Sequence, residues 1–165
     1  MRLSTLPDDA LTLLALSVQL LTEAGIDVPP NQYVAGGTLA WDMPSLTVYV
    51  GPVYLGTPNQ PQASSAWPNA IRWCAPFYIQ ILRDSTAVMP GFRGTRSPAV
   101  DQLQAEGIVM TNDLAALATL AMQIRAGGLM VPRSDMVGIG SITPLGPEGN
   151  MVGARCELHF QLDGQ

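Results

Sequence analysis

Residues 151–162, Met-Val-Gly-Ala-Arg-Cys-Glu-Leu-His-Phe-Gln-Leu, alternate between apolar and polar side chains. The even-numbered positions are all apolar, and Arg155, Glu157, His159 and Gln161 stand between them. A period of two is typical of a strand that packs one face on a core. We therefore predict a strand here, with one face on the core and a polar face on the other side.

The composition predicts one domain over residues 1–165 that is poor in charge. Hydrophobic residues make up 47% and charged residues 13%, against roughly 25% charged in a typical soluble domain. Interface cores are depleted in charge, so part of the surface is expected to be covered by other subunits. A Pro- and Gly-rich domain with neutral loops would give the same composition. The net charge of −5 disfavours a general binder of nucleic acid or anionic membranes.

The cysteines and the N-terminal segment indicate a reducing, cytoplasmic setting for the monomer. Cys156 falls on the apolar face of its predicted strand, whereas Cys74 falls on the polar face of another. Side chains on opposite faces cannot pair, so we expect two free thiols. The apolar run at 10–21 follows Asp8 and Asp9 rather than a basic region, and is too short to span a bilayer.

A leucine-rich helix is predicted between Thr5, which can cap it, and Gly25, which can end it in the left-handed conformation. Residues 26–45 are rich in Pro, Gly and Asn and predict a connector. Residues 46–50 then alternate as a strand, and Gly51-Pro52 should bend or bulge the chain before residues 53–55.

The second half of the chain predicts a long strand, two helices and a hairpin. Pro76 cannot donate to a ladder, so the strand over 70–83 should lie at a sheet edge or carry a bulge. A short helix from Pro98 to residue 106, ended by Gly107, and a longer one over 113–126 should form a pair. Residues 136–142 and 152–162 should form a hairpin across 143–150.

This order predicts an α+β fold. We expect a mainly antiparallel sheet of four or more strands, with the N-terminal helix and the central helix pair packed on it.

The pattern of reactive residues disfavours catalysis, and we expect no enzyme, no cofactor and no metal. A zinc site needs three or four ligands, and His159 has only Cys156 nearby, on the opposite face. Neither cysteine stands at a helix start or in a glycine-framed turn that would activate it. The Gly-rich pieces at 138–140 and 146–149 are not followed by a helix, so they predict no phosphate loop.

A helix-turn-helix DNA-binding motif is the main alternative function, because residues 101–125 predict a short helix, a glycine at 107 and a longer helix. Base reading requires donors and cations on the second helix. That helix is mostly alanine and leucine, with Asn112, Gln123 and Arg125 among few polar residues. We therefore expect a helix pair packed on the sheet rather than a DNA-reading motif.

The predicted loop at 84–97 and its flank form the one local basic patch that contains an aromatic residue. It carries Arg83, Met89, Phe92, Arg93 and Arg96. Met89 and Phe92 would otherwise be apolar and exposed. We predict that the loop is an arm that grips an acidic neighbouring subunit; the alternative is a solvated loop.

Residues 142–158, Ile-Thr-Pro-Leu-Gly-Pro-Glu-Gly-Asn-Met-Val-Gly-Ala-Arg-Cys-Glu-Leu, resemble the C-terminal hairpin of tail-terminator and related neck proteins of long-tailed bacteriophages. In those proteins a Pro-x-Gly-Pro-x-Gly turn leads to a glycine and a last alternating strand. Residues 144–149 and Gly153 match this pattern. The rest of the chain agrees in the order and size of its elements.

The resemblance implies a structural virion protein of the tail or neck, assembled in the host cytoplasm. Such a protein forms a homohexameric ring that caps the tail tube, stops its polymerisation and joins the tail to the head side. The implied partners are further copies of the chain, the major tail tube protein and a head-tail connector protein. DNA would pass through the ring without specific binding, and no membrane is involved. The alternative within this class is another neck component, a head-tail stopper or adaptor.

Ring subunits meet through heterologous interfaces, which need two different patches. The contact residues we expect are Arg155, Glu157 and His159 on the last strand, together with the loop residues named above.

Overall fold

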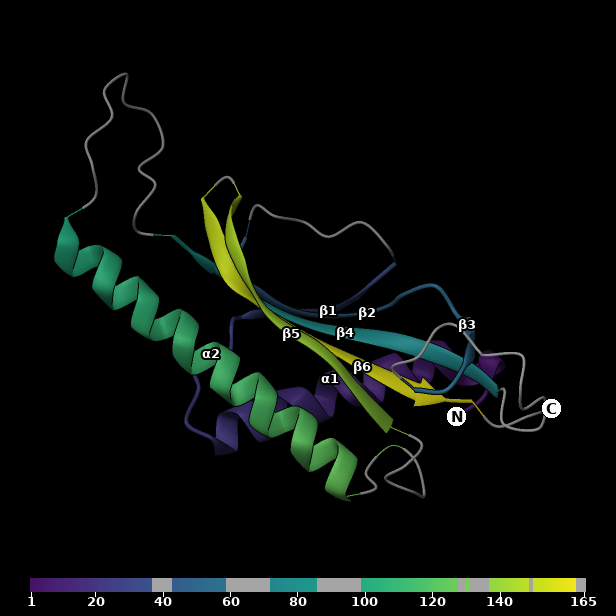
Figure 1. Cartoon of the computed structure of the whole chain (residues 1–165). Coiled ribbons are helices and arrows are strands. Elements are labelled where there is room, and N and C mark those ends of the chain that lie inside the picture. Colours follow the sequence, from purple (N-terminus) through teal and green to yellow (C-terminus); the bar gives the residue numbers. More distant parts are fainter. Residues whose placement is uncertain are drawn as a thin grey trace.

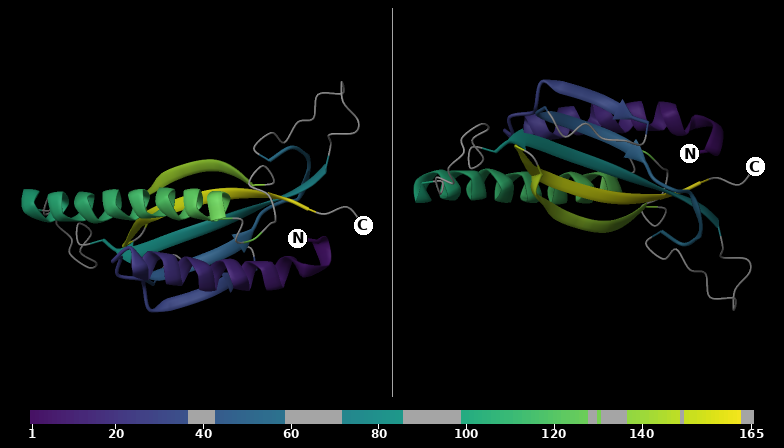
Figure 2. Two further views of the ribbon diagram at one scale, coloured as in Figure 1. Left: turned by 90° about the horizontal axis from the view of Figure 1, so that it is seen from below. Right: turned by 90° about the horizontal axis from the view of Figure 1, so that it is seen from above.

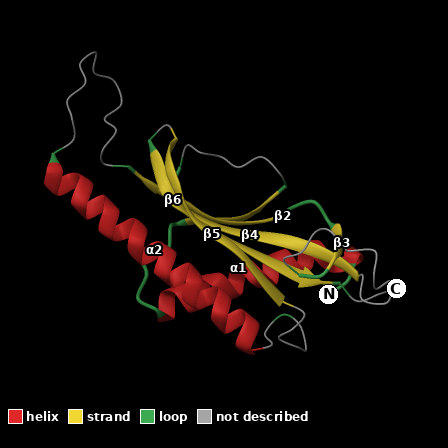
Figure 3. Cartoon of the chain, viewed as in Figure 1, coloured by secondary structure: helices red, strands yellow, loops and turns green. Residues whose placement is uncertain are grey.

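The chain folds into one mixed sheet with both described helices on the same face (Figure 1). The computed structural model describes residues 1–36, 43–58, 72–85, 99–127, 130, 137–148 and 150–162. Figure 3 separates the helical layer from the strand layer, which confirms the predicted α+β class. In chain order the elements are η1 (Leu3–Thr5), α1 (Leu6–Glu23), β1 (Asn31–Ala35), β2 (Ser45–Val50), β3 (Tyr54–Gly56), β4 (Arg72–Asp84), α2 (Val100–Gly127), β5 (Val137–Glu148) and β6 (Met151–Gln161).

The sheet is built around the long strand β4. The strand order is β1-β2-β4-β6-β5, and β3 pairs with β4 beyond the end of β2. The pairing of β1 with β2 is parallel and the other pairings are antiparallel. β4 and β6 stay in register from Cys74 opposite Gln161 to Asp84 opposite Met151. This pair forms the spine of the sheet.

The core lies between the sheet and the two helices. Seen from below, α1 and α2 lie in front of the strands, and from above they lie behind them (Figure 2). Phe77 and Phe160 are fully buried and meet edge to face, with ring centroids 5.3 Å apart. The alternation predicted for β6 is confirmed, because all its even-numbered residues from Val152 to Phe160 are buried.

The cysteines and the first helix also agree with the sequence. Cys156 belongs to the core under the helices, Cys74 stands on the other face, and both are free thiols. α1 ends at Glu23, and Gly25 has a φ of 75° as a left-handed terminator requires. Thr5 stands at the N-cap, but its hydroxyl bonds to Asp9 at 2.8 Å and to the backbone of Arg2, and not to the first-turn N–H groups of α1.

The predicted helix pair is wrong, because residues 100–127 form the single continuous helix α2. Gly107 has open space around it and costs a helix only about 1 kcal/mol relative to alanine. Thr111 lies inside this helix and donates its hydroxyl to the carbonyl of Gly107 one turn earlier, at 2.8 Å. The continuous helix removes the turn on which the helix-turn-helix reading depended.

The strand predictions need three corrections. β1 lies inside the expected connector, where Tyr33 and Val34 pair in parallel with β2. β5 runs on to Glu148, which pairs with Met151 of β6, because two register shifts absorb the extra residues. β4 is central rather than an edge strand. Pro76 is tolerated because it faces the predicted bend between β2 and β3, where its carbonyl accepts a bond from Gly51.

Gly153 of β6, in the central β4–β6 pair, provides a test of this packing. A Cβ at position 153 would overlap the carbonyl oxygen of Ile81 in β4. Gly153→Ala should therefore lower the free energy of unfolding by at least about 1 kcal/mol in urea denaturation. Gly146→Ala is the matched control, because nothing lies within 4 Å of a Cβ there. Equal stabilities of the two variants would contradict the β4–β6 register.

Candidate functional site on the sheet face opposite the helices

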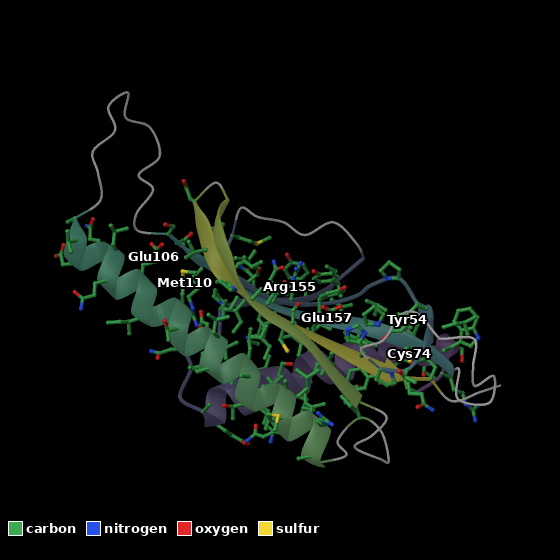
Figure 4. All side chains as sticks on the ribbon, viewed as in Figure 1. Tyr54, Cys74, Glu106, Met110, Arg155 and Glu157 are labelled. Atoms are coloured by element: carbon green, nitrogen blue, oxygen red, sulfur yellow. The ribbon has the colours of Figure 1, made fainter. Side chains whose placement is uncertain are left out.

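The predicted contact residues of β6 gather on the sheet face opposite the two helices. Arg155, Glu157 and His159 stand beside Gln80, Tyr78 and Pro76 of β4, respectively. Tyr49 of β2 continues the row on the far side of Tyr78. Figure 4 shows Arg155 and Glu157 close together on the strands of the sheet. The face therefore carries a band of polar and aromatic side chains drawn from several strands.

Glu157 is the acceptor at the centre of this band. Its Oε1 accepts a hydrogen bond from the Tyr78 hydroxyl at 3.1 Å and lies 3.0 Å from Nε2 of His159. Its Oε2 accepts from the Ser141 hydroxyl at 3.1 Å. One carboxylate thus joins β4, β5 and β6. Burial and the neighbouring Glu157 carboxylate raise the pKa of Tyr78, so its hydroxyl remains a donor at neutral pH.

The aromatic part of the band is a stack beneath an arginine. The rings of Tyr49 and Tyr78 are nearly parallel, with centroids 4.8 Å apart. The guanidinium of Arg155 lies 5.4 Å from the centroid of Tyr78, and its Nη1 donates to the Tyr49 hydroxyl at 3.4 Å. A cation over a tyrosine face is held by the quadrupole of the ring. Beside it, the fully buried Gln80 has no partner for either atom of its amide.

His159 links Glu157 to β3. Its Nδ1 lies 2.7 Å from the Tyr54 hydroxyl. A carboxylate only accepts, so Nε2 carries the proton towards Glu157 and Nδ1 accepts from Tyr54. Burial lowers the pKa of His159, although the Glu157 carboxylate opposes this effect. The imidazole is therefore neutral at physiological pH and acts as a structural bridge between β3 and β6.

The described side chains near His159 do not form an activated nucleophile. Burial raises the pKa of the Cys74 thiol, against the opposing effect of the Tyr54 hydroxyl. Burial raises the pKa of Cys156 to about 12. Both thiols are thus protonated at neutral pH, whereas cysteine nucleophiles need the thiolate. Among the described residues no group of three or more His, Cys, Asp or Glu side chains is arranged to hold a metal ion.

Arg83 makes an intramolecular ion pair that fastens α2 to the sheet. Its Nε and Nη2 donate to the two carboxylate oxygens of Asp113 at 2.6 and 2.8 Å, and Nη2 also donates to the carbonyl of Asp27 at 2.9 Å. The bond to Asp113 raises the pKa of Arg83, against the effect of burial. The other predicted arm residues, Met89, Phe92, Arg93 and Arg96, lie outside the described residues.

The N-terminal half of α2 is a surface that the sequence did not single out. None of residues 100–112 is buried, and Figure 1 shows this half of the helix projecting beyond the sheet. We call it the projecting half. Its apolar side chains are exposed by 80% at Val100, 47% at Leu103, 53% at Ile108 and 42% at Val109. The apolar residues of this segment are visible in the sequence, but the predicted break at Gly107 hid the fact that they belong to one long helix.

Comparisons of the sequence with known protein families and with curated proteins give no match.

The Arg83–Asp113 pair holds α2 at the point where the helix leaves the sheet. Removing the charge of Asp113 should therefore lower the free energy of unfolding. Asp113→Asn leaves the partly buried guanidinium without its counter-charge, so unfolding in urea should show a loss of about 3 kcal/mol. Asp101→Asn, on the exposed first turn of the same helix, should cost less than about 1 kcal/mol. A loss at Asp113 no larger than that at Asp101 would refute the anchoring role.

The His159 bridge should make stability depend on pH. Its pKa is lower in the folded chain than the ordinary value of about 6.5. Below that pH the unfolded chain therefore binds more protons than the folded chain does. The contribution of His159 to the free energy of unfolding is complete above that pH and declines as the pH falls. Relative to His159→Gln, which does not titrate, the wild type should lose stability below about pH 6.5. Parallel stability curves from pH 8 to pH 5 would rule out the bridge.

Proposed function

We propose that the chain is a structural subunit of a ring that caps the tail tube of a long-tailed bacteriophage. The ring would stop tube polymerisation and join the tail to a head-side connector. The resemblance of residues 142–158 to tail-terminator hairpins is the basis for this class. The subunit would act by shape and contact, without a cofactor, and would pass DNA through its centre without reading it.

The projecting half of α2 is the observation that carries the proposal. In a monomer, four apolar side chains on one helical arm would stay in water, which is costly in a chain with so few charges. An assembly subunit gains by covering them. A small-molecule enzyme would instead need a sizeable cleft. Among the described residues, the hollow beside Arg83 and Val109 measures about 150 Å³, below the roughly 300 Å³ of typical ligand sites.

The polar band on the sheet face opposite the helices fits the same role. Its hydrogen bonds connect β3, β4, β5 and β6 through Tyr54, Tyr78, Ser141 and Glu157. Such a network stiffens the sheet and leaves a surface of hydroxyl and aromatic groups with little net charge. A face of this kind suits a lumen that DNA must cross without sticking. The alternative, another neck component, would use the same features between different neighbours.

The experiment is to polymerise the major tail tube protein in the presence and absence of the chain and to image the products. We expect shorter tubes that end in a ring of this protein, because a capped end adds no further subunits. Tube protein alone is the control. Rings that bind a head-tail connector protein and leave tube length unchanged would favour the neck alternative. A chain that stays monomeric and leaves tube length unchanged would refute the proposal.

A further inference from the structure

We propose that Arg155, with Gln80 and Thr143 on either side of it, binds a carboxylate group. The inference goes beyond the proposed ring, because it concerns a site on a single chain and holds whether or not the chain assembles. The site lies in the polar band, on the side of the strands away from α2 (Figure 4).

The site belongs to one row of side chains that crosses the whole sheet. In spatial order from β1 to β5 the row consists of Tyr33, Thr47, Gln80, Arg155 and Thr143, each directly opposite the next. Side chains directly opposite each other share one face of a sheet, and their Cβ atoms lie about 5 Å apart in antiparallel pairs. The row therefore gathers polar groups from five strands on the face opposite the helices.

This row contains buried polar atoms that have no hydrogen-bond partner. They are Tyr33 Oη, both amide atoms of Gln80, Arg155 Nε and Thr143 Oγ1. The one other such atom among the described residues is Ser45 Oγ, two positions from the row on the same face of β2. Buried polar groups nearly always have a partner, so exceptions gathered in one place indicate a group that the chain itself does not supply.

The guanidinium of Arg155 decides which chemical group fits. It lies over the ring of Tyr78, and its Nη1 donates to the Tyr49 hydroxyl at 3.4 Å. Among the described residues neither Nε nor Nη2 has an acceptor. These two nitrogens form one edge of the planar guanidinium, and their parallel N–H groups match the two oxygens of a carboxylate.

Arg83 uses the same edge for a carboxylate within this chain. Its Nε and Nη2 donate to the two oxygens of Asp113 at 2.6 and 2.8 Å. Arg155 takes part in none of the described ion pairs. The two arginines therefore present the same donor edge, and only Arg83 meets its acceptor inside the chain.

Glu157, two residues further along β6, does not act as the counter-charge of Arg155. Its Oε1 accepts from the Tyr78 hydroxyl and lies 3.0 Å from His159, and its Oε2 accepts from Ser141. Arg155 is half-buried, so its charge is only partly solvated. A carboxylate from outside the chain would gain the charge-assisted hydrogen bonds that Glu157 does not make.

Gln80 and Thr143 would complete the site from the strands on either side. Gln80 Nε2 and the Thr143 hydroxyl are donors, and both stand directly opposite Arg155. One guanidinium balances one negative charge, and the nearby Glu157 would repel a second. The site therefore fits a singly charged carboxylate better than a phosphate dianion.

Binding requires a small movement of side chains. The unpartnered atoms are closed off from solvent, whereas the Arg155 side chain as a whole is half-buried. The distance of 3.4 Å from Nη1 to the Tyr49 hydroxyl is long for a hydrogen bond, so little is lost when the guanidinium turns its Nε edge outward.

The test is a titration of the full-length, ¹⁵N-labelled chain with sodium acetate, followed by NMR at the arginine Nε–H signals and the Gln80 side-chain amide. We expect a saturable shift at Arg155 and Gln80. Arg83 is the internal reference and should not shift, because its Nε edge already holds Asp113. Sodium chloride at equal ionic strength controls for screening. Inorganic phosphate should bind more weakly than acetate.

Three variants separate the proposed site from a general effect of charge. Arg155→Lys keeps the charge and loses the planar edge, and Gln80→Met keeps the length of the side chain and loses the amide. Each should bind acetate about tenfold more weakly or worse, read at the signal that the variant retains. Ser141→Ala is the matched control, because its hydroxyl donates to Glu157, and it should bind as the wild type does. Circular dichroism checks that each variant folds.

An Arg155 signal that does not shift, or that follows chloride as closely as acetate, would overturn the proposal. Tighter binding of phosphate, or unchanged binding of acetate in both Arg155→Lys and Gln80→Met, would overturn it as well.

Sedimentation velocity identifies the source of the carboxylate. Self-association that is weakened both by acetate and by Arg155→Lys would assign it to an acidic side chain of a neighbouring copy. Acetate binding without any effect on association would assign it to a small free carboxylate, and either result supports the site. Acetate binding by a chain that does not cap tail tubes would refute the ring and leave the site standing.

Discussion

The structure depends on the unbroken antiparallel pairing of β4 with β6. Because the two strands stay in register over their shared length, every side chain of β6 has a fixed face and a fixed neighbour. One face supplies the core, where Phe77 lies opposite Leu158 and the ring of Phe160 meets that of Phe77. The other face supplies the polar band around Glu157. A slip of one residue would exchange the two faces, so the core and the proposed contact surface are specified together.

The second constraint is the point at which α2 leaves the sheet. On the N-terminal side of the Arg83–Asp113 pair, α2 borders only the ends of β4 and β6, around the hollow lined by Asp84 and Val152, and four of its apolar side chains remain exposed. A helical segment of this length is marginal in water without packing. The core is therefore packed within the monomer, whereas the projecting half of α2 is packed only when a partner covers it. That division is what an assembly subunit needs, because the arm gains its packing only from a neighbour.

The sequence predicted the features that depend on local pattern and missed those that depend on tertiary contact. The alternation of residues 152–162, the termination of α1 at Gly25 and the opposite faces of the two cysteines followed from period and turn chemistry. β1 was missed because its parallel pairing with β2 is a long-range contact with no local signature. The predicted break at Gly107 was wrong, because the free energy that one glycine costs a helix is smaller than the stabilisation from the helical turns on either side of it. Of the candidate site, the row from Arg155 to His159 was predicted, whereas the Tyr49–Tyr78 stack needed the register of β2 on β4.

The central claim is that the projecting half of α2 is covered by another protein when the chain works. Hydrogen exchange of backbone amides, measured on dilute monomer and on concentrated or tube-bound protein, tests it most directly. The account predicts fast exchange over residues 100–112 in the monomer and clear protection after assembly, with β4 and β6 protected in both states. Residues 100–112 that exchange equally fast before and after assembly would contradict it.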